Sequence, residues 1–317
     1  MSMTARYLVL AGGLSHERDV SLKSGRRVLD ALRHEGVEAD LRDADASLLA
    51  TLAEVPYDAV FVALHGGAGE DGALREVLDV AGVPHVGATP DACRIAWDKP
   101  TAKSLARRAG LATPASVVLP HAAFRELGAA AVLDRLVGHL GLPLMVKPAR
   151  GGSALGCTTV DKPDELPAAM VSCFSYGEAA LVERFVEGTE VAVTVLDTGD
   201  GPRALPAVEI VPVSGVYDYT ARYTAGQTDF FCPARLAPPV EAAVAEAAVA
   251  AHTTLGLRDL SRVDLVVDAD GVPQLLEVNT APGMTETSLL PMAVEAAGLS
   301  FGALLHELLQ QAAARTP

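Results

Sequence analysis

The sequence predicts an α/β protein, α+β in its later part, with an open parallel α/β domain followed by two α+β domains. Short apolar runs and amphipathic helical segments alternate over residues 6–87, which is typical of a parallel sheet. From residue 190 onward, apolar runs follow one another with turns between them, which indicates antiparallel strands. The 317 residues, 50% of them hydrophobic, suffice for two or three domains with a sizeable core.

The first domain is predicted to span residues 1–95. Its strands and helices, in chain order, are Arg6–Ala11, Val20–His34, Asp58–Leu64, Ala73–Ala81 and a short third strand, Pro84–Gly87. In open α/β sheets ligands bind beyond the carboxyl ends of the strands, so the loops after the first two strands are candidate sites.

The other two domains are predicted over residues 96–184 and 185–317. The central domain should contain two helices and three strands, at Asp98–Ala109, Pro143–Lys147, Cys157–Val160, Pro163–Val171 and Ala180–Arg184. The last domain should contain antiparallel strands between residues 190 and 213, then Pro238–Leu255 (helix), Ser261–Val267 and Pro273–Val278 (strands) and Phe301–Ala314 (helix). The polar segment Ser214–Ala234 shows no element of its own, and so long a loop in a compact domain is usually a lid or a binding loop.

Composition limits the function. The formal net charge of −15 argues against nucleic acid and acidic membrane surfaces as partners, so an anionic substrate must meet a local cluster of Lys and Arg. The cysteines are scattered without a C-x-x-C pair, which indicates a reducing cytoplasm rather than disulfides or a zinc site. No apolar stretch is long enough to span a bilayer.

Polar residues alternate on the two predicted strands near the C-terminus. Arg262 and Asp264 lie on the first strand, and Glu277 and Asn279 lie on the second. Strand side chains repeat every second residue, so each pair faces one side, while Val263, Leu265, Leu276 and Val278 should form the opposite, apolar face. Carboxylate and amide oxygens suit Mg²⁺, and the arginine suits a transferring phosphoryl group. The alternative is two hairpin strands with solvated polar faces, which the apolar opposite face disfavours.

A glycine-rich segment follows the strand that ends at Lys147, reading Lys147-Pro-Ala-Arg-Gly-Gly-Ser153-Ala-Leu-Gly156. Glycines let a backbone fold over phosphates with its N–H groups inward, and Lys147 would touch them. The segment lacks the G-K-[ST] of a Walker loop, and alone it fits a flexible surface hairpin equally well. Lys99 starts a helix, where a lone lysine is more often solvated than functional.

Further candidates lie at other strand ends. The segment Leu181–Phe185 is interpreted as an interdomain hinge that would clamp an adenine, and Glu190 would bind ribose hydroxyls. Glu17 opens a helix, where it either holds a substrate ammonium or simply caps the helix. His65 lies in a glycine-dense turn past a strand end, although a lone histidine is usually a structural hydrogen-bonding residue.

Taken together, these segments resemble the D-alanine–D-alanine ligase family of the ATP-grasp superfamily. The motifs follow the order of that family along the chain: Gly12-Gly-x-Ser15-x-Glu17-Arg-x-Val-Ser21, His65-Gly-x-x-Gly-Glu-Asp-Gly72, Asp98-Lys99, Lys147-Pro with the glycine loop, Tyr217-Asp-Tyr-x-Ala-Arg-Tyr223, Phe231-Cys-Pro-Ala234, Arg262-x-Asp264, Glu277-x-Asn279-Thr-x-Pro-Gly283-Met-Thr and Ser288-Leu-x-Pro291-Met. The resemblance implies an ATP-grasp fold whose two later domains clamp ATP. It also implies a homodimer that makes D-alanyl-D-alanine from two D-alanine molecules for peptidoglycan synthesis.

The resemblance also implies a role for each site residue. ATP would meet Lys99, Lys147, Glu183, Arg184, Glu190 and Arg222, while two Mg²⁺ ions, with Mn²⁺ as an alternative, would be held by Asp264, Glu277 and Asn279. The first D-alanine would bind at Glu17 and His65, with Ser153 and Tyr223 hydrogen-bonded to Glu17. Arg262 and the N–H of Gly283 would stabilise the tetrahedral intermediate. Ser288 and the N–H of Leu289 would bind the second D-alanine's carboxylate.

The chain departs from the family pattern at a few positions. Arg75-Glu76 stands where Gln-Gly is usual, Arg184 and Arg222 stand where Lys is usual, and Ala154 replaces a common serine. Arginine does not replace lysine neutrally at a phosphate or adenine contact.

Other functions are less well supported by the sequence. A nucleotide-binding redox enzyme would need the absent G-x-G-x-x-G. A non-catalytic ATP sensor should have lost a metal ligand or a phosphate lysine, and none is lost. A family member that uses D-lactate, D-serine or another amino acid as its second substrate stays open.

Overall fold

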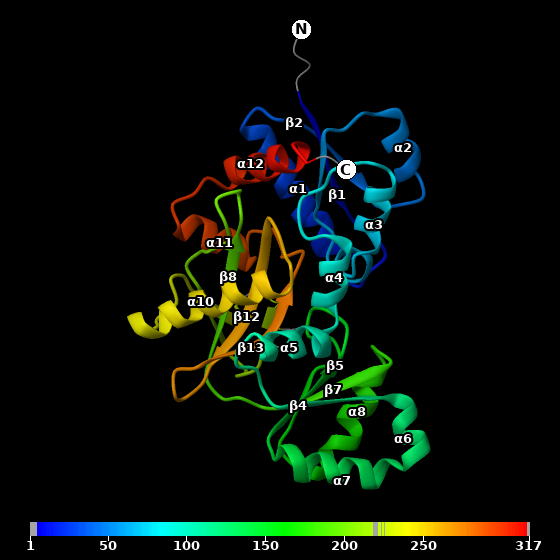
Figure 1. The fold of residues 1–317 in the computed structure, drawn as a ribbon, viewed down its shortest axis with the longest axis vertical. Coiled ribbons are helices and arrows are strands. Elements are labelled where there is room, and N and C mark those ends of the chain that lie inside the picture. The colour runs from blue at the N-terminus through cyan, green and yellow to red at the C-terminus, as the bar shows by residue number, and fades with distance from the viewer. Residues whose placement is uncertain (1–4, 218–220, 223, 225, 316–317) are drawn as a thin grey trace.

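The computed structural model describes residues 5–217, 221, 222, 224 and 226–315, and Tyr223 lies outside these residues. The described residues form three sheets stacked along the long axis of the molecule (Figure 1). Within the described ranges no single helix is long and apolar enough to cross a membrane. The one bent pair that passes by length and composition, Leu289–Ala296 with Phe301–Ala313, contributes buried leucines to the core.

The N-terminal sheet is parallel, as predicted, with the strand order β2 (Glu38–Asp43), β1 (Arg6–Ala11), β3 (Ala59–Val62). Helices α1 (Arg18–His34), α2 (Leu48–Glu54) and α3 (Ala73–Val80) connect and cover it. Strand β2 and helix α2 were not predicted, because β2 has few apolar residues and α2, with seven residues, is too short to show a clear helical period. The predicted third strand at Pro84–Gly87 was wrong, because only a single parallel bridge, Val60 to His85, forms there.

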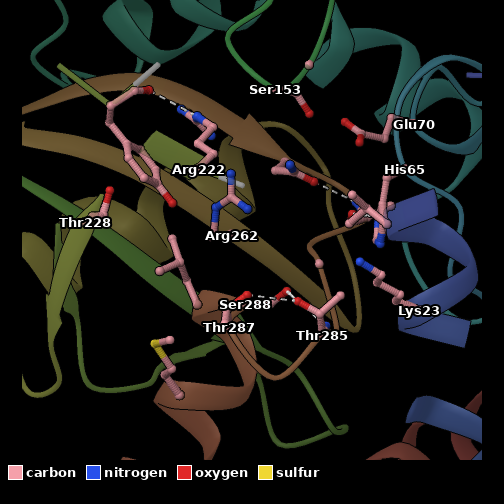
Figure 2. A pocket seen from close by; sticks show the side chains of 18 of the residues that line it. Lys23, His65, Glu70, Ser153, Arg222, Thr228, Arg262, Thr285, Thr287 and Ser288 are labelled. Carbon is pink, nitrogen blue, oxygen red and sulfur yellow. Dashed lines mark hydrogen bonds between the residues drawn. The ribbon is translucent and has the colours of Figure 1, made fainter. Parts of the chain in front are cut away.

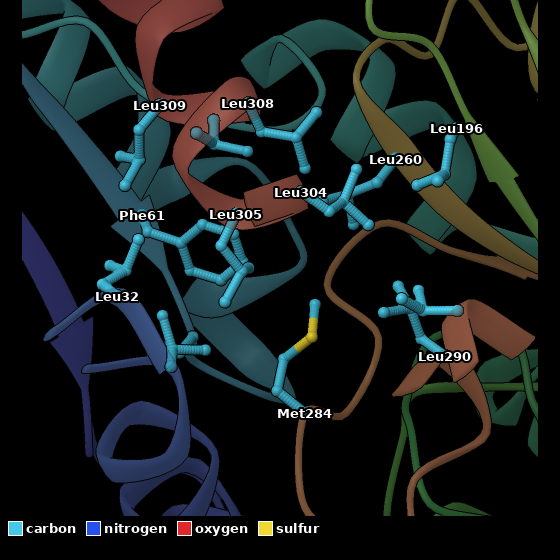
Figure 3. Packing of buried hydrophobic residues seen from close by; sticks show 14 of the residues in the cluster. Leu32, Phe61, Leu196, Leu260, Met284, Leu290, Leu304, Leu305, Leu308 and Leu309 are labelled. Atoms are coloured by element: carbon cyan, nitrogen blue, oxygen red, sulfur yellow. The ribbon is translucent and has the colours of Figure 1, made fainter. Parts of the chain in front are cut away.

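The last helix of the chain completes the core of the N-terminal sheet. Helix α12 (Phe301–Ala313) packs on α1 and β3, and its leucines contact Phe61 and Leu32 (Figure 3). Helix α11 (Leu289–Ala296) belongs to the same buried cluster through Leu290. The N-terminal domain therefore depends on residues from the far end of the chain.

The central sheet is small and antiparallel. Its strand order is β4 (Ser116–Pro120), β7 (Ala179–Arg184), β5 (Leu144–Pro148), β6 (Thr158–Val160). Helices α6 (His121–Leu127), α7 (Ala129–Leu140) and α8 (Leu166–Phe174), the last preceded by a short 3₁₀ turn η2 (Pro163–Glu165), form its separate hydrophobic core.

The large C-terminal sheet carries most of the candidate site. Its order is β11 (Thr228–Phe231), β10 (Val208–Pro212), β8 (Thr189–Leu196), β12 (Leu260–Val267), β13 (Pro273–Asn279), with β9 (Arg203–Ala204) paired to β8. All pairings are antiparallel, as expected. Strand β11 lies inside the segment expected to have no element, because Phe230 and Phe231 pair with β10.

One face of the large sheet is covered by α10 (Pro238–Thr254), α4 (Pro90–Trp97) and α5 (Lys99–Arg108). The predicted domain boundaries stay a prediction. The packing nevertheless groups α5 with the C-terminal sheet rather than with the central one, since Ala102 and Ala106 share a cluster with Val263 and Val278. Lys99, at the start of α5, is thereby held against the end of β13.

Candidate active site

Two adjoining cavities lie between the sheets. The first, about 940 Å³, is bounded by α1, the His65 turn, the glycine-rich loop and the start of α11 (Figure 2). The second, about 330 Å³, lies between the central and C-terminal sheets. Among the described residues, six line both cavities and mark where they meet: Lys99, Gly151, Gly152, Tyr217, Arg222 and Glu277.

The polar residues of β12 and β13 meet across the strand pair, as their alternation predicts. Arg262 lies opposite Asn279, and Asp264 lies opposite Glu277. The Arg262 guanidinium donates from Nε to Asp264 Oδ1 at 2.7 Å and from Nη2 to Oδ2 at 2.8 Å. Both side chains are buried, so this bidentate pair holds a fixed orientation at the cavity wall.

A β-bulge lies next to this pair, and it makes the predicted place of Leu276 on the apolar face wrong. The register shifts between Asp264 and Leu265, so that Leu275 rather than Leu276 pairs with Leu265 and enters the apolar core. Leu276 instead lines the second cavity. The extra residue of a bulge re-aims the side chains beside it, and here it gives the cavity an apolar wall.

The donor set of Asp264, Glu277 and Asn279 fits a hard divalent cation, since it offers two carboxylates and one amide oxygen on adjacent strands. Burial alone would raise the pKa of Glu277, but Lys99, Arg222 and Lys147 lower it to about 2, so this carboxylate is ionised at neutral pH. In the described part of the chain, no three His, Cys, Asp or Glu side chains form a metal-binding cluster. A cation bound here would therefore need Asn279 and further oxygen ligands from a substrate in addition to the two carboxylates.

Lys99 joins the glycine-rich loop to the polar strand pair. Its Nζ donates to the Gly151 carbonyl at 2.6 Å and lies 3.3 Å from Glu277 Oε2. The loop turns sharply, because Ser153 and Ala154 both have φ values near +55° (54° and 56°), in the left-handed region. Lys99, uninformative in isolation, thus lies where the two cavities meet.

Lys147 belongs to a buried ionic triad that the sequence analysis did not find. Its Nζ lies 2.7 Å from Glu183 Oε2, and Lys103 contacts Glu183 Oε1. All three side chains are buried, and Glu183 also borders the second cavity. The signal for Lys103 was available, because it follows Lys99 by one helical turn on α5.

The second cavity combines apolar walls with a few polar groups. Met145, Phe185 and Leu276 line it together with Glu190. Burial raises the pKa of Glu190 to about 7, although Arg222 opposes the rise. Arg184 borders the cavity but donates from Nε to the Leu140 carbonyl at 3.1 Å, so its guanidinium is committed to the central domain.

Of the residues predicted to bind the first substrate, His65 lines the first cavity on the N-terminal side, whereas Glu17 is buried next to the His65 turn and does not line the cavity itself. Glu17 is buried and packs closely on two glycines: a Cβ at Gly66 would lie 2.3 Å from Glu17 Oε2, and one at Gly152 would lie 3.1 Å from Oε1. Side chains at these two positions would displace the carboxylate. The glycine-rich loop and the His65 turn thus converge on Glu17.

His65 is held from both ring nitrogens, Nδ1 2.9 Å from the Ala281 carbonyl and Nε2 2.8 Å from Ser24 Oγ. Burial lowers the pKa of His65 to about 4, so the imidazole is neutral at physiological pH. It therefore connects the N-terminal turn to the segment after β13 without adding charge to the cavity.

Glu70, in the motif that begins at His65, is a buried carboxylate for which the sequence predicted no role. Its Oε1 accepts the Gly66 N–H at 2.8 Å, and the residue lines the first cavity on the wall facing Arg262 (Figure 2). Burial raises the pKa of Glu70 to about 7, and the nearby Glu17 and Glu277 add to the rise.

The segment from Gly283 to Leu289 forms the floor of the first cavity. Ser288 Oγ accepts the Thr285 N–H at 2.9 Å, and a Cβ at Gly283 would lie 2.6 Å from it, so only glycine fits there. Ser288 immediately precedes α11 and Leu289 is its first residue. The free N–H groups of this helix end suit a carboxylate.

Arg222 closes the site from the side of β10 and β11. Its guanidinium stacks 4.4 Å from the centre of the Tyr217 ring, and Nε donates to the Tyr217 carbonyl at 3.2 Å. It lies on the wall of both cavities. The predicted role of Tyr223 stays a prediction.

Comparisons with known proteins agree with this architecture. Residues 105–310 match the family described as "D-ala D-ala ligase C-terminus". The chain is 42% identical over 307 residues to a D-alanine--D-alanine ligase of Bordetella petrii, covering 97% of this chain and 92% of that protein. It is 44% identical over 310 residues to a D-alanine--D-alanine ligase of an Anaeromyxobacter species, covering 97% of each.

Solved structures give the same result. The D-alanine--D-Alanine ligase from Bacillus anthracis superposes with a TM-score of 0.83 at 29% identity, over 98% of this chain and 97% of that one. The VanG D-Ala:D-Ser ligase from Enterococcus faecalis also gives 0.83, at 30% identity over 98% and 99% of the two chains.

Proposed function

This chain belongs to the D-alanine–D-alanine ligase family, and from that premise we propose that it joins two D-alanines with cleavage of ATP to ADP and phosphate. One observation carries the proposal: the bidentate Arg262–Asp264 pair faces Glu277 and Asn279 beside the junction of the two cavities. A nucleotide in the smaller cavity would direct its terminal phosphate to that junction.

The smaller cavity fits the nucleotide. Its apolar walls, Met145, Phe185 and Leu276, would enclose an adenine, and Glu190 would accept hydrogen bonds from the ribose. Lys147 and Lys99 would meet the phosphates, with Glu183 keeping Lys147 oriented. Arg184 would contribute through its backbone, since its guanidinium is bonded elsewhere.

Mg²⁺ would be held by Asp264, Glu277 and Asn279. When bound it neutralises charge on the transferring phosphoryl group. In its absence Arg262 pairs with Asp264 and Lys99 lies beside Glu277, so each carboxylate has a cationic neighbour.

The first D-alanine would occupy the N-terminal wall of the larger cavity. Its ammonium would bind Glu17, beside Ser153 and Tyr223, with the neutral His65 holding the wall in place. Its carboxylate would then face the junction and attack the γ-phosphorus, and the bond to the departing ADP would break. The product is an acyl phosphate, a better acyl donor than a carboxylate.

The second D-alanine would bind through its carboxylate at Ser288 and the Leu289 N–H. Its amine, once deprotonated, would attack the acyl carbon, and phosphate would leave. Arg262 and the N–H of Gly283 would stabilise the tetrahedral intermediate. Water must be kept out, since it would hydrolyse the acyl phosphate, and the glycine-rich loop with residues 214–234 is suited to that task.

We also propose a homodimer in the cytoplasm that supplies D-alanyl-D-alanine for peptidoglycan. A second substrate other than D-alanine is the alternative, favoured by the fold similarity to the D-Ala:D-Ser ligase.

The test is ADP release with purified protein across D-alanine, D-serine, D-lactate and the L-amino acids, with products identified by mass spectrometry. D-alanyl-D-alanine with ADP and phosphate is expected. AMP and pyrophosphate, or activity with L-alanine alone, would refute the proposal.

A further inference from the structure

Arg75 is a buried arginine that the proposed chemistry does not use. It lies on α3, where the family pattern has glutamine, and it is only 1% exposed. The next residue, Glu76, points to solvent and pairs with Arg94 at 2.8 Å. Arg75 therefore points into the protein, away from any surface on which a partner could contact it.

The guanidinium of Arg75 holds two main-chain carbonyls from different domains. Nη1 donates to the Gly69 carbonyl at 2.5 Å, and Nη2 lies 3.5 Å from the Thr280 carbonyl. Among the residues that the structure describes, the Nε of Arg75 has no hydrogen-bond partner, and the other guanidinium nitrogens contact main-chain carbonyls rather than a carboxylate. A buried cation with incomplete pairing is costly, so stability alone does not account for it.

The two carbonyls belong to two segments that meet at a seam in the wall of the site. Gly69 ends the short turn η1 (Gly67–Gly69) between His65 and Glu70, and Thr280 directly follows Asn279. The same seam is bridged by His65 Nδ1 to the Ala281 carbonyl and by Thr280 Oγ1 to the Glu70 carbonyl at 3.3 Å. Arg75 contacts the same two segments through the Gly69 and Thr280 carbonyls.

We propose that Arg75 is a positioning residue that sets the distance between the first-substrate wall and the end of β13. Its two hydrogen bonds fix the turn that touches Glu17 relative to Asn279. It contacts neither substrate. The proposal rests on the proposed ligase function, because that function assigns the first D-alanine to the wall beside Glu17 and the metal to the end of β13.

The test compares Arg75→Met, Arg75→Gln and the control Arg94→Gln, an exposed arginine on α4. Arg75→Met should lower kcat at least about tenfold and raise KM for the first D-alanine, because an ångström-scale misplacement can cost about 10²-fold. The ATP Kd, measured by calorimetry without D-alanine, should change less than about twofold, since hydrophobic walls far from Arg75 hold the base. Arg75→Gln should restore most of kcat, because its amide can still donate to one carbonyl.

Two results would overturn the inference. One is wild-type kcat and KM in Arg75→Met. The other is a parallel loss in both Arg75 variants that follows a lower melting temperature and leaves both KM values unchanged, as a merely structural role predicts.

Amide exchange separates this inference from the proposed function. Residues 279–283 should exchange faster in Arg75→Met than in wild type or Arg94→Gln. If the wild type makes no dipeptide, the ligase function fails, and unchanged exchange would then refute the role of Arg75 as well.

Discussion

Glu70→Gln should make the protein more stable at pH 8 and much less so at pH 5. Glu70 is buried beside the first cavity, and its Oε1 accepts a hydrogen bond from the Gly66 N–H. Glutamine keeps the same length and a carbonyl that can accept that bond. The substitution therefore removes mainly the charge.

The magnitude follows from the pKa of Glu70, which burial raises from 4.5 to about 7. At about 1.36 kcal/mol per pH unit, this rise corresponds to roughly 3 kcal/mol. The unfolded chain ionises first as pH rises past 4.5, so the folded state loses stability between 4.5 and about 7 and bears the full penalty above 7. Below 4.5 the carboxyl is neutral in both states and the penalty vanishes.

The assay is urea unfolding of wild type and Glu70→Gln at pH 5 and pH 8, followed by circular dichroism. Glu76→Gln is the matched control, since Glu76 is an exposed carboxylate on the neighbouring helix. The Glu70 variant should gain up to about 3 kcal/mol at pH 8. Equal unfolding midpoints for wild type and Glu70→Gln at both pH values would show that Glu70 is not a destabilised buried carboxylate.

Three further predictions concern the proposed site. Glu277→Gln should abolish ADP release at ordinary Mg²⁺ concentrations and leave the circular dichroism spectrum unchanged. A neutral amide would hold Mg²⁺ poorly, so the charge on the phosphoryl group would not be neutralised. Near-full activity would contradict the metal assignment. Glu183→Ala should destabilise the protein by about 3–5 kcal/mol, since two buried ammonium groups lose their partner. Lys103→Met should destabilise it less, because Lys147 still pairs with Glu183. Equal unfolding free energies for the two variants would count against the triad. Tyr223→Phe should raise the ratio of D-lactate to D-alanine products at pH 6 and pH 8 with little change in affinity for the first substrate, and an unmoved ratio would remove Tyr223 as the selector.

The sequence by itself predicted the polar faces of β12 and β13 and the glycine-rich loop. Alternation along a strand is a local property, so Arg262 with Asp264 and Glu277 with Asn279 were paired before any tertiary information. The ordered motifs likewise identified Glu17, His65 and Ser288 as candidate substrate-binding residues. The parallel first domain followed from the alternation of strand and helix.

Only the tertiary structure decided which of these groups are paired, buried or turned away. Lys103 meets Glu183 because α5 packs beneath the C-terminal sheet, a contact that no local pattern encodes. Leu276 turns into the second cavity because a bulge shifts the register by one residue, and a period-2 pattern cannot reveal a bulge. Helix α12, at the far end of the chain, packs on the first sheet. Burial of apolar surface does not depend on distance along the chain, so the sequence pattern cannot tell which helix covers this sheet.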